Sequence, residues 1–173
     1  MSILNIAFKR NHLKKVYEIL LIESQIMTHP IATAARQQAI NEAHDVGIDD
    51  AYLSQMVEQF YARVQVDDIL GPIFAQRITD WPHHLAHMKR FWRSIMLKTG
   101  EFSGNPMMKH AAISNIDNPE FSHWLKLFAE TLDKLGGPPE ARARIYKRAE
   151  MIAESLLLGI HIHRDGVKFP LKV

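Results

Sequence analysis

Residues 50–66 read DAYLSQMVEQFYARVQV, and this stretch decides the class of fold. Its apolar side chains recur at intervals of three and four residues, which places them on one face of an α-helix. These apolar positions are Leu53, Met56, Val57, Phe60, Tyr61 and Val64. Asp50 stands at the start, where an aspartate side chain can cap the free N–H groups of a helix. The stretch predicts an amphipathic helix with its N-cap at Asp50.

Three more segments of the same kind follow, separated by glycine and proline. They predict helices over residues 81–99, 119–135 and 139–163. The predicted caps are Asp80 for the first of them and Asp117 or Asn118 for the second. The predicted inward faces are His84, Leu85, Met88, Phe91, Trp92 and Ile95, then Phe121, Trp124, Leu125, Phe128 and Leu132, then Ile145, Ala149, Ile152, Ala153 and Leu156.

No segment shows the alternation of apolar and polar residues that a strand requires, so the sequence predicts an all-α fold. Residues 100–113 are expected to form a loop with at most a short helix. The first 46 residues predict two further helices, Asn5 to about Met27 and Ala32 to Val46, joined at His29 and Pro30.

Composition excludes several classes of protein. The chain has 173 residues, about one domain, and no cysteine, which excludes disulfides, thiolate metal sites and a thiol nucleophile. The net charge is only +2 with no dominant basic patch, so nucleic acid is not an expected partner. No segment has the length of a membrane span or the pattern of a secretory signal, and we expect a cytoplasmic location.

Histidine is the unusual component, with ten residues. The stretch HHLAH over residues 83–87 places histidines three and four apart, a spacing at which two could share a divalent ion. It lacks the glutamate of the zinc-protease motif, and His161 and His163 form only a further pair. Helix-surface histidines are therefore favoured over a zinc site.

Polar residues on the apolar faces indicate a different chemistry. Tyr61, His84 and Trp124 each place a hydrogen-bond donor on an otherwise apolar stripe, and His110 stands alone at the end of a loop rich in glycine and proline. Together they predict a pocket with an apolar wall and a few polar points. Haem fits such a pocket, because its iron needs an imidazole on one side and a tuned polar environment on the other.

Four stretches, in this order and at these intervals, resemble the truncated globins, specifically the group III branch. They are FYARVQVDDILGPIF (60–74), WPHHLAHMKRFW (81–92), FSGNPMMKH (102–110) and FSHWLKLF (121–128). The resemblance covers roughly residues 48–158, and the double-glycine turns of the other truncated groups are absent. It implies a short helical sandwich around haem over residues 47–163, with an amino-terminal helical extension (1–46) and a carboxy-terminal tail (164–173).

The resemblance also implies the site residues. His110 corresponds to the proximal ligand of the iron of haem b, and Tyr61, His84 and Trp124 correspond to the distal residues around the bound gas. The residues implied to contact the cofactor are His110, Phe74, Met88, Trp92, Tyr61, His84 and Trp124. Phe102 departs from the pattern, since the family often has tyrosine there.

Each implied residue has a physical role. The second ring nitrogen of His110 is expected to donate to a backbone carbonyl, which orients the imidazole. Tyr61 and Trp124 are the expected donors to the gas, with His84 as a third donor or a gate; a shift of one position would turn His83 or His87 inward instead. Candidates to meet the haem propionates are His87, Lys109 and Arg77.

The implied function is a haem protein that binds dioxygen, nitric oxide or carbon monoxide at a pentacoordinate-type iron, for oxygen transport, storage or sensing. The alternative is a haem enzyme that turns over nitric oxide or peroxide with an external reductase, because the chain has no flavin or nicotinamide signature. A haem-free helical module is the third possibility. The extension could be a membrane-surface or dimer helix, or could reflect an upstream start, with Met27 as a second initiator.

Overall fold

The computed structural model describes residues 33–113 and 116–165. The chain divides into two compact units, residues 1–41 and 42–173. Residues 33–45 are helical, as predicted for the segment 32–46. The helix predicted over residues 5–27, including Met27, lies outside the described residues, as does most of the proposed tail.

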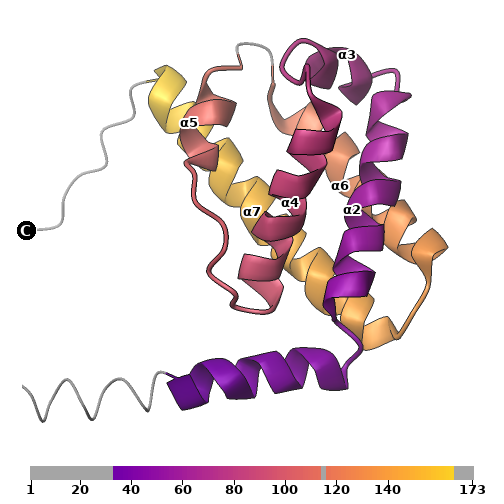
Figure 1. The fold of residues 1–173 in the computed structure, drawn as a ribbon. Coiled ribbons are helices and arrows are strands. Elements are labelled where there is room, and N and C mark those ends of the chain that lie inside the picture. Colours follow the sequence, from indigo (N-terminus) through magenta and orange to yellow (C-terminus); the bar gives the residue numbers. More distant parts are fainter. Residues whose placement is uncertain (1–32, 114–115, 166–173) are drawn as a thin grey trace, which may run out of the picture. The chain divides into compact units, whose positions relative to one another are not determined.

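The rest of the described chain is also helical and contains no strand, which confirms the all-α class (Figure 1). Its helices are α2 (Asp50–Gln65), α3 (Leu70–Ala75), α4 (Trp81–Met96), α5 (Pro106–Ala111), α6 (Asn118–Leu135) and α7 (Pro139–Asp165). The short helix allowed for between residues 100 and 113 is α5, whereas α3 was not predicted. No described helix has both the length and the apolar character needed to cross a membrane.

Aspartates begin the principal helices. Asp49 has an extended backbone, and its side chain caps α2 by accepting a hydrogen bond from the backbone N–H of Tyr52 at 2.7 Å. The predicted cap at Asp50 is therefore wrong by one residue: Asp50 lies in the first turn, where its carboxylate pairs with Arg93 at 2.9 Å. Asp80 caps α4, and Asp117 caps α6 in a capping box, as expected.

The helices form two packed pairs. α2 packs against α4, α6 packs against α7, and a contact between α2 and α6 joins the pairs, while α5 packs against α7 (Figure 1). All six apolar residues predicted for α2 are buried, which confirms its inward face. From α7, Ala141, Ile145, Ala149, Ala153 and Ile160 are buried.

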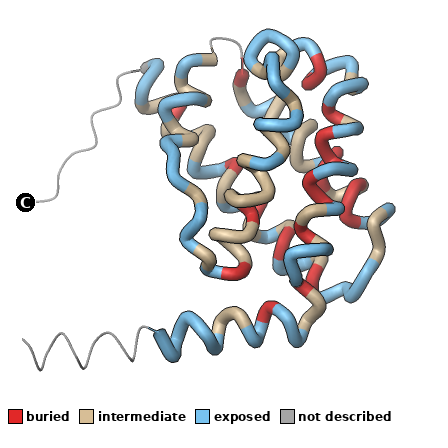
Figure 2. Tube along the Cα trace, in the orientation of Figure 1, coloured by how far each residue is buried: buried red, intermediate tan, exposed pale blue. Residues whose placement is uncertain are grey.

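The predicted inward face of α4 is buried only at Trp92. Leu85, Met88 and Phe91 are half-buried, although they share that face, and the contrast with α2 is visible in Figure 2. The front part of α6 behaves in the same way, since Phe121, Trp124 and Leu125 are half-buried while Phe128 and Leu132 are buried. Apolar side chains of α4 and of the first part of α6 thus remain partly exposed.

Candidate functional site

His84 and Tyr61 meet at the amino-terminal end of α4. The Asp80 cap and Pro82 fix the start of this helix, so His84 lies one turn after Trp81 on the same face. The imidazole of His84 stands edge-on to the phenol ring of Tyr61, with centroids 4.9 Å apart. His83 is exposed. Of the histidines in the stretch HHLAH, His84 is therefore the one beside the buried tyrosine, as predicted.

The imidazole of His84 is half-buried, and its Nε2 atom is shielded from solvent. Its Nε2 atom has no hydrogen bond among the described residues. Burial, with smaller contributions from the charges of His87, Lys109 and His83, lowers the pKa of His84 to about 4, so the ring is neutral at pH 7. Burial also raises the pKa of Tyr61, whose hydroxyl stays protonated and can donate. The pair therefore offers uncharged polar groups on an apolar wall.

His110 is held by its own helix. The side chain of Asn105 caps α5, and Pro106 occupies the first turn. His110 Nδ1 lies 2.8 Å from the carbonyl oxygen of Pro106, one turn earlier. Because a carbonyl oxygen only accepts, Nδ1 carries the proton and Nε2 keeps its lone pair, which is the tautomer of a metal-ligating histidine. Burial lowers the pKa of His110, which favours the neutral ring.

Trp124 belongs to a cluster of aromatic side chains from α2, α4 and α6. Its ring stacks on Phe128 with centroids 5.2 Å apart, and Phe128 stacks on Trp92 at 5.3 Å. Phe60 touches the edges of both Trp124 and Tyr61, at 5.3 Å and 5.1 Å. Phe60 is thus the connection between two predicted distal residues, and the sequence analysis had assigned it only to the core.

The remaining walls are aromatic. The ring of Phe74, on α3, packs against Tyr61 at 5.9 Å and His84 at 6.5 Å. Trp81 was missed, although its ring lies 5.7 Å from His84 and 6.2 Å from Tyr61. The signal for Trp81 was its place three residues before His84, one turn away on the same helix face.

Positive charges act on the histidines of α4. The charge of Lys109, at the end of α5, contributes to lowering the pKa of both His84 and His87. The guanidinium of Arg90 lies 3.5 Å from Nδ1 of His87. Of the other propionate candidates, Arg77 already donates to the carbonyl of Ala112, at 3.1 Å.

Phe102 packs against α4. Its ring contacts His87 at 4.7 Å and Phe91 at 5.0 Å, so the residue that departs from the family pattern contributes apolar area to the wall. Across the described part of the chain, no group of three or more His, Asp or Glu side chains is arranged to hold a metal ion.

The residues fit haem. His110 presents a neutral nitrogen of the tautomer that coordinates iron, and the apolar wall suits a flat porphyrin. The Nε2 atom of His84 is buried and has no hydrogen-bond partner among the described residues. Because an unpaired buried polar atom is costly, a polar ligand beside it would be favourable.

Comparison with known proteins identifies globins as relatives of this chain. The family described as Bacterial-like globin matches residues 43–157. The group 3 truncated hemoglobin of Campylobacter jejuni is 34% identical over 110 residues, which cover 61% of this chain and 86% of that protein. A group 2 truncated hemoglobin of Bacillus subtilis is 28% identical over 69% of this chain and 91% of its own length.

Solved structures show the same likeness. The crystal structure of the group III truncated hemoglobin from Campylobacter jejuni superposes with a TM-score of 0.61 and 33% identity, covering 65% of this chain and 91% of that one. The crystal structure of the hemoglobin from Chloroflexus aurantiacus superposes with a TM-score of 0.55 and 25% identity, covering 68% of this chain and 96% of that one. The chain belongs to the bacterial-like globin family, as a truncated haemoglobin of the group III branch. Membership implies a haem protein that binds small gaseous ligands.

Proposed function

We propose that this globin binds haem b through His110 and holds dioxygen, or another diatomic gas, at a pentacoordinate-type iron on the side of Tyr61, His84 and Trp124. Haem, when bound, would supply an iron atom that His110 can ligate and that can bind a diatomic gas. Phe74, Met88 and Trp92 are the proposed apolar contacts of the porphyrin. His87, Lys109 and Arg77 are the proposed cations for its propionates.

One observation carries the proposal: Nε2 of His84 is buried with no partner among the described residues, beside the phenol ring of Tyr61. Buried polar atoms are normally hydrogen-bonded, so this atom favours the binding of a polar ligand beside it. A dioxygen ligand carries partial negative charge and accepts hydrogen bonds, which Tyr61 can donate, and a neutral His84 can donate when its proton is on Nε2. Bound carbon monoxide is much less polar and gains little from the same donors.

A second candidate is a haem enzyme that consumes nitric oxide or peroxide with electrons from an external reductase. The observation in its favour is that the rings of Tyr61 and His84 lie side by side, because two donors that hold a gas tightly suit turnover better than simple delivery. Turnover by the wild type that is lost in His84→Phe would favour this candidate over simple gas binding.

The distal donors can be tested by gas release. Tyr61→Phe deletes only the hydroxyl, and we expect dioxygen to leave about 10 to 150 times faster, the effect of losing one hydrogen bond to a charged group. Trp124→Phe is expected to act in the same direction, and the two effects should not add, since both donors orient one ligand. Release of carbon monoxide is expected to change far less. Stopped-flow release of both gases from the single and double variants measures this.

Tyr52→Phe is the matched control. Tyr52 also lies on α2, but its hydroxyl donates to the carbonyl of Gly136 at 2.8 Å, outside the pocket. We expect wild-type release of both gases from this variant. Equal acceleration of dioxygen and carbon monoxide in Tyr61→Phe would show a steric gate instead of a donor, and no change in either would remove Tyr61 from the site.

A further inference from the structure

The helix that carries His110, α5, is too short to be stable without contacts to the rest of the chain. α5 has six residues, from Pro106 to Ala111, and a helix of this length is not stable alone in water. It packs against α7 (Figure 1). The position of the imidazole is therefore determined mainly by how α5 rests on α7.

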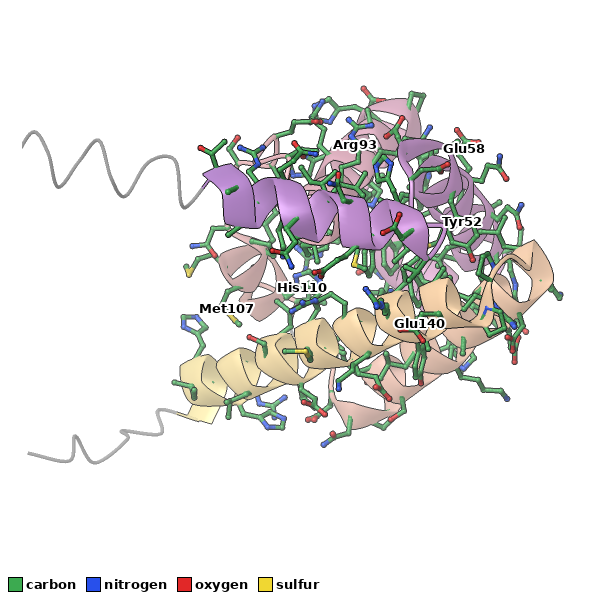
Figure 3. The ribbon with its side chains drawn as sticks, turned by 90° about the horizontal axis from the view of Figure 1, so that it is seen from below. Tyr52, Glu58, Arg93, Met107, His110 and Glu140 are labelled. Atoms are coloured by element: carbon green, nitrogen blue, oxygen red, sulfur yellow. The ribbon has the colours of Figure 1, made fainter. Side chains whose placement is uncertain are left out.

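Gly159 is the point of closest approach between these helices. The Sδ and Cε atoms of Met107 occupy the space that a Cβ atom on Gly159 would fill, and Cγ of Met107 would be 3.3 Å from it. Figure 3 shows Met107 and His110 where α5 lies alongside α7. The side chain of Met107 thus rests on the bare backbone of α7, and any side chain at position 159 would have to push the end of Met107 away from this position.

The carboxy-terminal part of α7 is itself anchored. His161, two residues after Gly159, pairs through Nε2 with Oδ1 of Asp117 at 2.9 Å, and Arg164 pairs with Oδ2 at 3.0 Å. Asp117 is the cap of α6, so these contacts tie α7 to the start of its neighbour. A side chain at position 159 would therefore displace the end of Met107 more readily than α7, and α5 would lose this contact with α7.

We propose that Gly159 and Met107 form a seat that sets the position of His110. Met107 and His110 are three residues apart in one helix, and the carbonyl that orients the imidazole belongs to Pro106, the residue before Met107. If α5 shifts on α7 when this contact is lost, both the histidine and the group that orients it move together. Both are positioning residues, and the inference rests on the proposed binding of haem by His110.

The test compares Gly159→Ala and Met107→Ala with the control Met108→Ala in the full-length chain as purified. Met108 is the neighbouring methionine on α5 and is 56% exposed. In Gly159→Ala and Met107→Ala we expect backbone amides of α5 to exchange hydrogen about tenfold faster, and haem to transfer to an acceptor globin about tenfold faster. We also expect the iron–histidine stretching band of the ferrous protein to shift and broaden. Met108→Ala should match the wild type in all three.

Two further variants make the result specific. Met107→Leu keeps most of the volume and is expected to retain the wild-type band. The double variant Gly159→Ala, Met107→Ala should be no worse than Met107→Ala alone, because both changes remove the same contact. If Gly159→Ala shows wild-type hydrogen exchange in α5 and an unchanged iron–histidine stretching band, the proposed role of Gly159 and Met107 is wrong. A wild-type chain that takes up no haem would instead overturn the proposed function, so the two failures are distinct.

Discussion

A buried and unpaired Nε2 atom distinguishes His84 from His87, whose Nδ1 lies 3.5 Å from the guanidinium of Arg90. The sequence predicted the inward position of His84 from helical spacing, and the structure confirms that His84 lies beside Tyr61 while His83 is exposed. The hydrogen bond between His110 and a backbone carbonyl was also expected, and Pro106 supplies it. Trp81 could have been recognised from its place one turn before His84 on α4. Met107 could not, because its role depends on a contact between α5 and α7.

At the residue scale we predict a pH dependence of stability from His84. Its pKa in the folded chain is about 4, below the ordinary value of 6.5, so the unfolded chain takes up a proton first as the pH falls. This group therefore costs no stability above pH 6.5 and reduces stability progressively between 6.5 and 4. Denaturant unfolding of wild type and His84→Phe over this range measures it.

His84→Phe should lose less stability than the wild type on acidification. The pKa values of His87 and His110 are also lowered by burial, and their contributions act in the same direction in both proteins, so the difference between the two isolates His84. Parallel pH profiles for the two proteins would show that His84 is not buried as a neutral ring.

At the scale of elements, the inward face of α2 was predicted completely, since its periodicity and burial coincide. The cap was displaced by one residue because Asp49 and Asp50 are adjacent and only the backbone decides between them. α3 escaped prediction because six residues containing Gly71 and Pro72 show no usable period. The half-buried face of α4 was predicted as an inner face, but the sequence alone does not distinguish a core from a pocket wall.

The turn between α6 and α7 provides a prediction at the same scale. Gly137 has a φ of +88°, and a Cβ there would lie 2.8 Å from the ring of Tyr52. Gly100 has a φ of +71° with no atom within 4 Å of its Cβ position, which makes it a matched control. Gly100→Ala should lower the free energy of unfolding by ~1 kcal/mol from backbone strain alone. Gly137→Ala should cost ~1–3 kcal/mol more, from the clash with Tyr52.

Denaturant titration of the two glycine variants gives this comparison. Equal losses would mean that the ring of Tyr52 moves aside without penalty. In that case its hydrogen bond to the carbonyl of Gly136 contributes little to the turn.

For the whole molecule, the family match begins at residue 43 and the second compact unit begins at residue 42. All the proposed haem-contacting residues lie within this unit. We therefore predict that deletion of residues 1–26 leaves haem binding intact. Haem titration of the shortened chain, followed by absorbance, measures this. A shortened chain that no longer holds haem would show that the amino-terminal segment belongs to the globin domain.

The central claim is that His110 is the ligand through which the protein holds haem. The most direct measurement is the ferrous absorption spectrum of His110→Ala, with and without added imidazole. We predict that the variant loses haem or shows an altered spectrum, and that free imidazole restores the wild-type spectrum by occupying the vacated axial position. A variant that keeps the unaltered wild-type spectrum without imidazole would contradict the assignment and make His84 the next candidate for the ligand.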